Sequence, residues 1–280
     1  MTVAQFEESR ARGAAVEIYL FRFGTEPTAF HAYCDVEFPV TVDGVTYEPL
    51  PIQRAQITSQ QSLDKADVDV KVPMSSEIAG LFSLLPPSTK VTLVIRRGQA
   101  DDPDQEFPVI FSGHVQQSSR DGRTATLRCV PASVSIKRVG LRRHYQYTCP
   151  HVLYDQDPGS CRANKAAVTQ PARPVTAIAS NRVTLAAGWN GTPAEAKYVG
   201  GMIEWDGPYG RERRTIIRVN GNVLSLSGLP SGLSVGNTVD VVPGCNHQTD
   251  DCAALHNNIV NFGGMPYIPT ENPVKRNPFT

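Results

Sequence analysis

The clearest hairpin in the chain lies in residues 214–226, which read Arg214-Thr215-Ile216-Ile217-Arg218-Val219-Asn220-Gly221-Asn222-Val223-Leu224-Ser225-Leu226. Segments rich in Ile, Val and Leu flank Asn220-Gly221, and this dipeptide readily adopts the left-handed conformations of a tight hairpin turn. The stretch therefore predicts two antiparallel strands. It indicates that the second half of the chain is mainly β.

The first half shows the same pattern of short strands and turns. Apolar and polar residues alternate with period two in 16–20 and 68–72, which is typical of strands with one solvent-exposed face. Asp43-Gly44 and Asp121-Gly122 have the composition of hairpin turns. One short helix is expected in 75–82, where a serine can cap the first turn. We expect the rest of this half to form an antiparallel sheet or barrel.

The length of the chain indicates two domains, because 280 residues exceed the usual domain size of roughly 100–200. Strand-like alternation lapses between 136 and 166, where a basic stretch from Lys137 to Arg143 is expected to form a solvated or subunit-facing linker. We therefore predict one domain in 1–140 and a second, β-rich domain in 141–280. From Gly244 onward, Asn, Pro and Gly predominate, and we expect an irregular tail.

The charge balance argues against several functions. The 27 basic residues equal the 27 acidic ones, so no net field attracts the chain to nucleic acid or to an anionic membrane. Neither a signal peptide nor an apolar run of about 18 residues is present in the sequence. We therefore expect no specific nucleic-acid partner and no membrane-spanning segment, and we expect the chain to fold in a cytoplasm.

The six cysteines fall into two classes. Cys34 and Cys129 lie in strand-like segments, where a lone thiol behaves as a small core residue. The other four lie in loop-like sequence, in two pairs that flank the hairpin-bearing segment: Cys149, Cys161, Cys245 and Cys252. Because disulfides are rare in a cytoplasm, four such thiols are candidates for one metal site that would pin the irregular tail to the start of the second domain.

The residues alone leave the identity of the metal open. Four free thiols without a metal are the alternative to a metal site. The spacing lacks the two-residue gaps common in structural zinc sites, whereas iron–sulfur clusters also use four cysteines. His151 and His247 lie near the candidate ligands, which allows a cysteine–histidine nucleophile, a mixed metal site, a role beside the sulfur atoms, or simple exposed loop histidines. No orienting third group or oxyanion loop is evident, so we expect no catalytic residue and no enzyme activity.

Two further loops invite functional readings that we set aside. The acidic segment 101–106 lacks the residues that follow in an EF-hand, and we expect a solvated turn rather than a calcium site. Gly263-Gly264 lies in a segment without the lysine of a phosphate-binding loop, and its paired glycines are expected to allow close backbone approach.

Several motifs together resemble a family of phage and prophage minor tail proteins, with related members in gene transfer agents and a distant likeness to the phage lambda minor tail protein L. The motifs in the second half are Tyr145-Gln146-Tyr147-Thr148-Cys149-Pro150-His151-Val152-Leu153-Tyr154-Asp155, Gly244-Cys245-Asn246-His247-Gln248-Thr249-Asp250-Asp251-Cys252 and Asn261-Phe262-Gly263-Gly264-Met265-Pro266-Tyr267-Ile268-Pro269. Those in the first half are Tyr47-Glu48-Pro49-Leu50 and Phe111-Ser112-Gly113-His114-Val115. The likeness covers most of the chain.

The resemblance implies a mainly β protein with an N-terminal, tail-tube-like antiparallel β-barrel and a smaller β-rich domain with a metal-stapled tail. It implies a non-enzymatic homotrimeric hub in the virion, assembled in the bacterial host cytoplasm, with a [4Fe–4S] cluster on Cys149, Cys161, Cys245 and Cys252. Zinc is the alternative metal. The implied partners are a distal tail or tube protein, a central tip or fibre-bearing protein and, as a further candidate, the tape-measure protein. The rival functions are a cysteine-dependent cell-wall hydrolase and a zinc-stapled binding module.

Overall fold

The computed structural model describes residues 14–24, 28–57, 67–83, 86–100, 102, 104–137, 145–207 and 210–269. These residues form two compact units: the first contains the described residues up to 137 together with those of 206–212, and the second contains the rest. The predicted domain boundary between residues 140 and 141 lies outside the described residues, as does all of the basic stretch 137–143 except Lys137.

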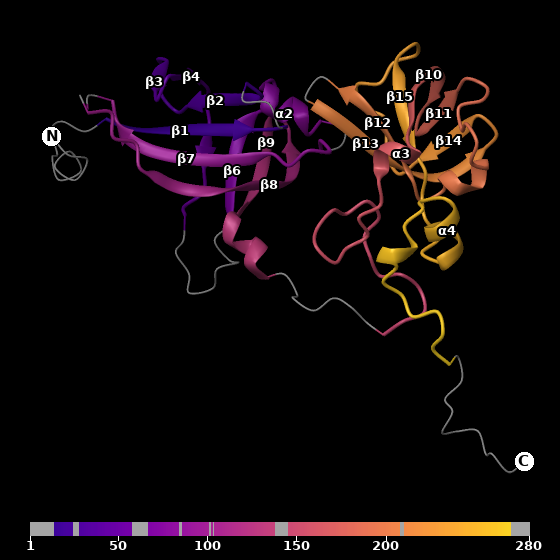
Figure 1. The fold of residues 1–280 in the computed structure, drawn as a ribbon. Helices are drawn as coiled ribbons and strands as arrows, with labels where there is room; N and C mark the ends of the chain where they lie inside the picture. Colours follow the sequence, from indigo (N-terminus) through magenta and orange to yellow (C-terminus); the bar gives the residue numbers. More distant parts are fainter. Residues whose placement is uncertain are drawn as a thin grey trace, which may run out of the picture. The chain divides into compact units, whose positions relative to one another are not determined.

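The first unit is built almost entirely of strands. Its elements are β1 (Ala15–Arg22), β2 (Phe30–Cys34), β3 (Val40–Val42), β4 (Val45–Pro49), β5 (Gln53–Arg54), β6 (Val68–Pro73), α2 (Glu77–Leu81), β7 (Thr92–Gln99), β8 (Val109–Asp121), β9 (Thr124–Pro131) and η1 (Ala132–Lys137). The strands form one nine-stranded sheet in the order β3-β4-β2-β1-β7-β8-β9-β6-β5 (Figure 1).

The predicted turns fold this sheet locally. Asp43 and Gly44 both have positive φ, at 51° and 76°, and they join β3 to β4 as expected of a two-residue hairpin. At the second site the strands pair as far as Asp121 and Thr124, so the turn consists of Gly122 and Arg123. One pairing departs from the expected antiparallel pattern. β2 and β4 run parallel, because the chain reverses once between β2 and β3 and a second time in the β3–β4 hairpin.

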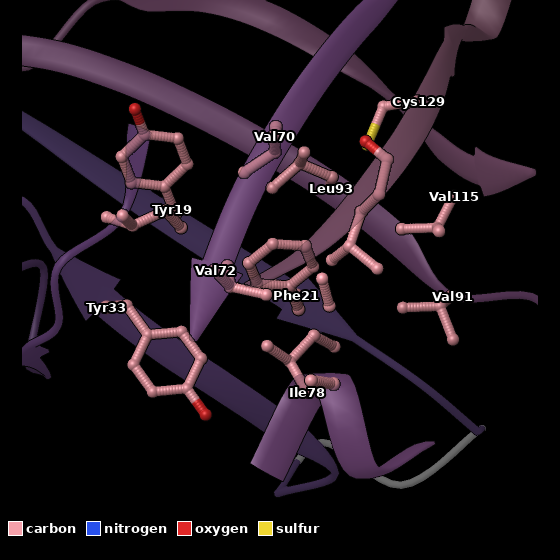
Figure 2. Close-up of a cluster of buried hydrophobic side chains, with 14 of the residues drawn as sticks. Tyr19, Phe21, Tyr33, Val70, Val72, Ile78, Val91, Leu93, Val115 and Cys129 are labelled. Atoms are coloured by element: carbon pink, nitrogen blue, oxygen red, sulfur yellow. The ribbon is translucent and has the colours of Figure 1, made fainter. Parts of the chain in front are cut away.

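The sheet packs against two apolar clusters, because alternate residues of β1 belong to different ones: Tyr19 and Phe21 to the larger cluster, Ile18 and Leu20 to the smaller. Arg54, on the edge strand β5, donates to Glu17 of β1 through Nε (2.8 Å) and Nη2 (2.5 Å). Figure 2 shows Ile78 of α2 close to Phe21 of the sheet, and both side chains are fully buried. Ser76 caps this helix by accepting from Ala79 N (3.3 Å), which confirms the predicted short helix.

The second unit is centred on a small closed barrel. Its elements are α3 (Lys165–Val168), β10 (Gln170–Ala179), β11 (Arg182–Leu185), η2 (Glu195–Tyr198), β12 (Met202–Gly207), β13 (Gly210–Asn220), β14 (Val223–Leu226), β15 (Thr238–Val242), α4 (Thr249–Ala254) and η3 (Ile259–Asn261). Six strands close in the order β10-β11-β14-β13-β12-β15, and pairing of β15 with β10 completes the ring (Figure 1).

The quoted hairpin supplies two of the barrel strands. The hairpin forms as predicted, but Asn220 pairs with Val223 and Val219 with Leu224, so the two-residue turn is Gly221-Asn222 and not Asn220-Gly221. The barrel interior is filled by side chains that include Trp189 and Trp205, each at most 2% exposed. It is therefore a packed core and not a channel.

The structure confirms that the chain is mainly β. The closed barrel lies in the second unit, whereas the first unit has an open sheet by its hydrogen bonds. Between β15 and residue 269, the last one described, the chain has α4 and η3 as its only helices and no strand, which agrees with the expected irregular tail. In the acidic loop Asp102 is buried and accepts from the backbone N–H groups of Asp104 and Glu106, both at 3.1 Å, so this carboxylate folds the loop internally and is not solvated as expected.

Candidate cysteine site of the second unit

The four loop cysteines come together in the second unit. Cys149 and Cys161 lie in the segment before α3, and Cys245 and Cys252 lie after β15 and in α4. All four line one pocket together with three histidines and two asparagines. In Figure 1 the segment before α3 and the tail after α4 lie side by side. Sequence positions that are far apart thus converge on one small volume.

The first cysteine loop runs from Cys149 to Cys161, and hydrogen bonds within it turn the chain back on itself just before Cys161. The backbone carbonyl of Asp155 accepts from Arg162 N (2.7 Å) and from Ser160 Oγ (2.7 Å). Tyr154 anchors the loop, because its hydroxyl donates to the carbonyl of Pro243 (2.7 Å). Gly159, at φ 74°, supplies the left-handed residue that this return requires.

A buried carboxylate shapes the second loop. Asp251 is 4% exposed, accepts from Asn246 N (3.0 Å) and pairs with Lys197 of η2. The loop between Cys245 and Cys252 is thus closed on itself and held to the barrel. Sequence inspection gave Asp251 no role, because its position directly before a cysteine carries no recognisable signal.

His247 links the two loops. Its carbonyl accepts from Cys149 N (2.8 Å), and its Nδ1 lies 3.0 Å from the carbonyl of Cys149. Since a carbonyl oxygen only accepts, Nδ1 carries the proton. The backbone N–H of His247 also donates to Cys245 Sγ (3.3 Å), and its φ of 59° aims that group at the sulfur. His247 is therefore a structural contact of the site and not a free loop histidine.

The C-terminal tail packs against the first loop through its paired glycines. Gly263 N donates to Cys149 Sγ (3.4 Å), and a Cβ at this position would lie 2.5 Å from Nε2 of His151. A Cβ on Gly264 would lie 2.6 Å from the carbonyl oxygen of Tyr147. The sequence prediction of close backbone approach at these glycines is confirmed.

Two buried polar residues that sequence reasoning overlooked complete the lining of the pocket. His256 is 7% exposed, donates from Nε2 to the carbonyl of Gly244 (3.0 Å), and meets the Tyr154 ring edge-on at 5.6 Å. Asn258 is 8% exposed, and its Nδ2 donates to the carbonyl of Cys161 (2.5 Å) and lies 3.7 Å from Cys161 Sγ. Neither residue stands in a pattern that predicts burial.

The electrostatics of the site oppose an ionised cysteine that lacks a counter-charge. Burial, followed by the nearby Asp251 carboxylate and the other thiols, raises the pKa of Cys245. Burial and the thiols of the same pocket raise the pKa of Cys252 to about 11. A nucleophilic cysteine needs a lowered pKa, so these two thiols do not support the hydrolase alternative. Four thiolates here would need positive charge in the pocket.

Four convergent thiols form a ligand set used by both iron–sulfur clusters and structural zinc sites. Within the described parts of the chain, no three His, Cys, Asp or Glu side chains are arranged to hold a single metal ion. The remaining cysteines, Cys34 and Cys129, are both fully buried in the first unit, as the sequence predicts. Burial raises the pKa of Cys129 to about 12, which fits an inert core thiol.

Comparisons with known proteins divide the chain in a similar way. Residues 4–164 match the family described as "Baseplate hub protein, N-terminal attachment domain", and residues 196–272 match "Phage conserved hypothetical protein BR0599". Each match contains one of the two cysteine pairs. A solved structure described as the virion of a native gene transfer agent (GTA) particle aligns with a TM-score of 0.79 over 99% of this chain and 95% of that one, at 18% identity. No match was found among curated proteins.

The fold and the site define a two-unit, mainly β protein whose second unit carries a loop module lined by four cysteines. Because the first match covers more than half of the sequence, the chain belongs to the family of baseplate hub proteins with this N-terminal attachment domain. It is a structural protein of a phage-type tail or baseplate and is located in the virion. None of the described helices has the length and apolar character needed to cross a membrane.

Proposed function

We propose that three copies of this chain form a ring at the distal end of the tail and that a [4Fe–4S] cluster on Cys149, Cys161, Cys245 and Cys252 staples the second unit. The ring joins the end of the tail tube to the central tip or fibre-bearing protein, and the chain catalyses no reaction. The observation that carries the proposal is the convergence of two distant cysteine pairs on one pocket in a protein of the baseplate hub family.

The residues around the pocket fit such a cluster. Three of the four sulfur atoms have an N–H group within hydrogen-bonding range, from His247, Asn258 and Gly263. Hydrogen bonds to sulfur are a general means by which proteins stabilise and tune iron–sulfur clusters. When bound, the cluster supplies metal–thiolate bonds across the two loops and offsets the thiolate charges, so that ligation contributes directly to folding.

Exposed apolar side chains in two uncharged segments of the same module support a role in joining other tail proteins. The segments 145–154 and 257–269 contain no Asp, Glu, Lys or Arg. They nevertheless expose large apolar side chains, which are Tyr145 (74%), Tyr147 (50%), Val152 (68%), Ile259 (48%), Val260 (93%), Met265 (46%) and Tyr267 (96%). Large apolar side chains at protein surfaces are common in interaction sites, and an apolar, uncharged partner surface fits these two segments.

The cluster is tested by assaying iron and acid-labile sulfide, with a visible spectrum, on full-length protein purified anaerobically. Brown protein with near-equal iron and sulfide is expected. Colourless protein with stoichiometric zinc would replace the cluster by the zinc-stapled module. Protein without metal, taken from its native particle, would overturn the four-cysteine site.

The stapling role is tested with Cys245→Ser against Cys34→Ser as the matched control. Cys34 Sγ lies 3.4 Å from the carbonyl oxygens of Phe38 and Tyr47, so a serine hydroxyl there finds acceptors outside the pocket. We expect only Cys245→Ser to lose the cluster and to loosen the second unit. Tails that assemble and infect normally with metal-free Cys245→Ser protein would show that stapling is not needed.

The ring is tested in the particle, because copies of a hub protein need not form a trimer before they dock in the tail. Quantitative mass spectrometry of purified tails, with a symmetric neighbour of known copy number as standard, should give three copies of this chain per tail. A copy number of one, or of six, would contradict the trimeric ring.

A further inference from the structure

Asn258 lies between one cysteine of the first pair and one of the second. Its side-chain Nδ2 donates to the carbonyl of Cys161 (2.5 Å) and lies 3.7 Å from Cys161 Sγ. Its backbone N–H donates to the carbonyl of Cys252 (2.8 Å). A single buried residue therefore contacts both halves of the site.

The orientation of the Asn258 amide is fixed by Asn261. Nδ2 of Asn261 donates to Oδ1 of Asn258 (2.7 Å), and the Asn261 backbone N–H donates to the Asn258 carbonyl (3.0 Å). With Oδ1 engaged as an acceptor, the amide nitrogen must face Cys161. An aspartate of the same shape would instead turn an acceptor oxygen toward the carbonyl and the sulfur of Cys161, and both of those groups are electron-rich.

We propose that Asn258 is a positioning residue that joins the two halves of the cysteine site and donates a hydrogen bond to the Cys161 sulfur. This inference rests on the proposed four-cysteine metal centre. The side chain fixes Cys161, the backbone fixes Cys252, and Asn261 holds the amide in the donating orientation. Loss of the donor leaves more charge on that sulfur, which disfavours the reduced cluster and weakens retention of the metal.

The test compares full-length wild-type protein with Asn258→Asp and with Asn257→Asp, a control that adds the same charge at an exposed neighbouring position. Metal content, the midpoint potential in an anaerobic titration, and the rate of iron loss to a chelator are measured. Asn258→Asp is expected to lose iron about 10- to 100-fold faster and to have a lower midpoint potential, in line with the usual effect of residues that support metal ligands. Asn257→Asp is expected to match wild type.

If Asn258→Asp does not fold, Asn261→Ala carries the test, because it removes the donor that orients the amide without touching a cysteine. It should shift both readouts in the same direction by a smaller amount. The inference is wrong if Asn258→Asp, or Asn261→Ala in its place, has the same rate of iron loss and the same midpoint potential as Asn257→Asp. That result would leave the proposed metal centre intact. Wild-type protein without metal would overturn both the metal centre and the inference. If the protein contains zinc, the rate of zinc release is compared between the same variants.

Discussion

Replacing Gly264 with alanine measures how tightly the C-terminal tail packs on the first cysteine loop. A Cβ at Gly264 would lie 2.6 Å from the carbonyl oxygen of Tyr147 and 2.8 Å from the carbonyl carbon of Thr148. Both atoms belong to the backbone, so no side-chain rotation relieves the overlap. The tail has to move away from the loop.

That movement breaks contacts whose energies can be estimated. It separates Met265 N from the carbonyl of Gln146, now at 2.9 Å, and Gly263 N from Cys149 Sγ, now at 3.4 Å. A lost backbone hydrogen bond costs about 1 kcal/mol, and overpacking adds roughly 1–3 kcal/mol. The free energy of unfolding of the second unit should therefore fall by about 2–4 kcal/mol, which lowers its Tm by roughly 5–15 °C.

Calorimetry of the full-length protein, combined with tryptophan fluorescence, provides the measurement. Both tryptophans, Trp189 and Trp205, lie in the barrel core of the second unit and report on it directly. Gly80→Ala serves as the control, because no atom lies within 4 Å of a Cβ built on that glycine of α2. The control should be neutral or stabilising by up to about 1 kcal/mol. A Gly264→Ala protein that melts at the wild-type temperature would refute the packing argument.

Two further predictions concern the first unit. Arg54→Met removes the cation beside Glu17, whose side chain is only 14% exposed and keeps the hydrogen bond from the Tyr19 hydroxyl. The free energy of unfolding, measured in urea, should fall by about 3 kcal/mol. The double variant Glu17→Leu/Arg54→Met should recover most of the loss, and an equal cost for both variants would contradict a buried pair. Burial lowers the pKa of His31 despite the opposing effect of Glu77, so the folded chain binds fewer protons there than the unfolded chain does. This contribution to stability is present above the ordinary pKa of about 6.5 and is lost as the pH falls through the folded-state value, so unfolding measured between about pH 8 and pH 5 should show a smaller decline for His31→Phe.

Local signals in the sequence predicted the strands and their turns well. The β3–β4 and β13–β14 hairpins form where turn residues lie between apolar segments; the predicted turn is correct at Asp43-Gly44, whereas at Asn220-Gly221 the turn lies one residue later. Cys34 and Cys129 lie in alternating segments, and both are buried as that pattern predicts. These features depend on neighbours a few positions away.

Such local signals could not predict which strands pair when they are far apart in the sequence. Nothing local states that β4 lies parallel to β2, or that β15 returns to β10 and closes the barrel in the second unit. The polar residues of the cysteine site were missed for the same reason. Asp251, His256 and Asn258 each contact a residue far along the chain, which is Lys197, Tyr154 and Cys161 respectively, whereas their own neighbourhoods have the composition of an ordinary polar loop.

The two cysteine loops are ordered by a different kind of contact from the rest of the protein. Among the described residues, the three apolar core clusters include nothing from 145–169 or 243–269. Order in these loops comes instead from hydrogen bonds between buried polar side chains and backbone carbonyls, and from N–H groups aimed at sulfur. Such contacts contribute little net stability each, since each replaces a hydrogen bond to water. The proposed metal centre on the four thiols would supply the additional order across the two loops.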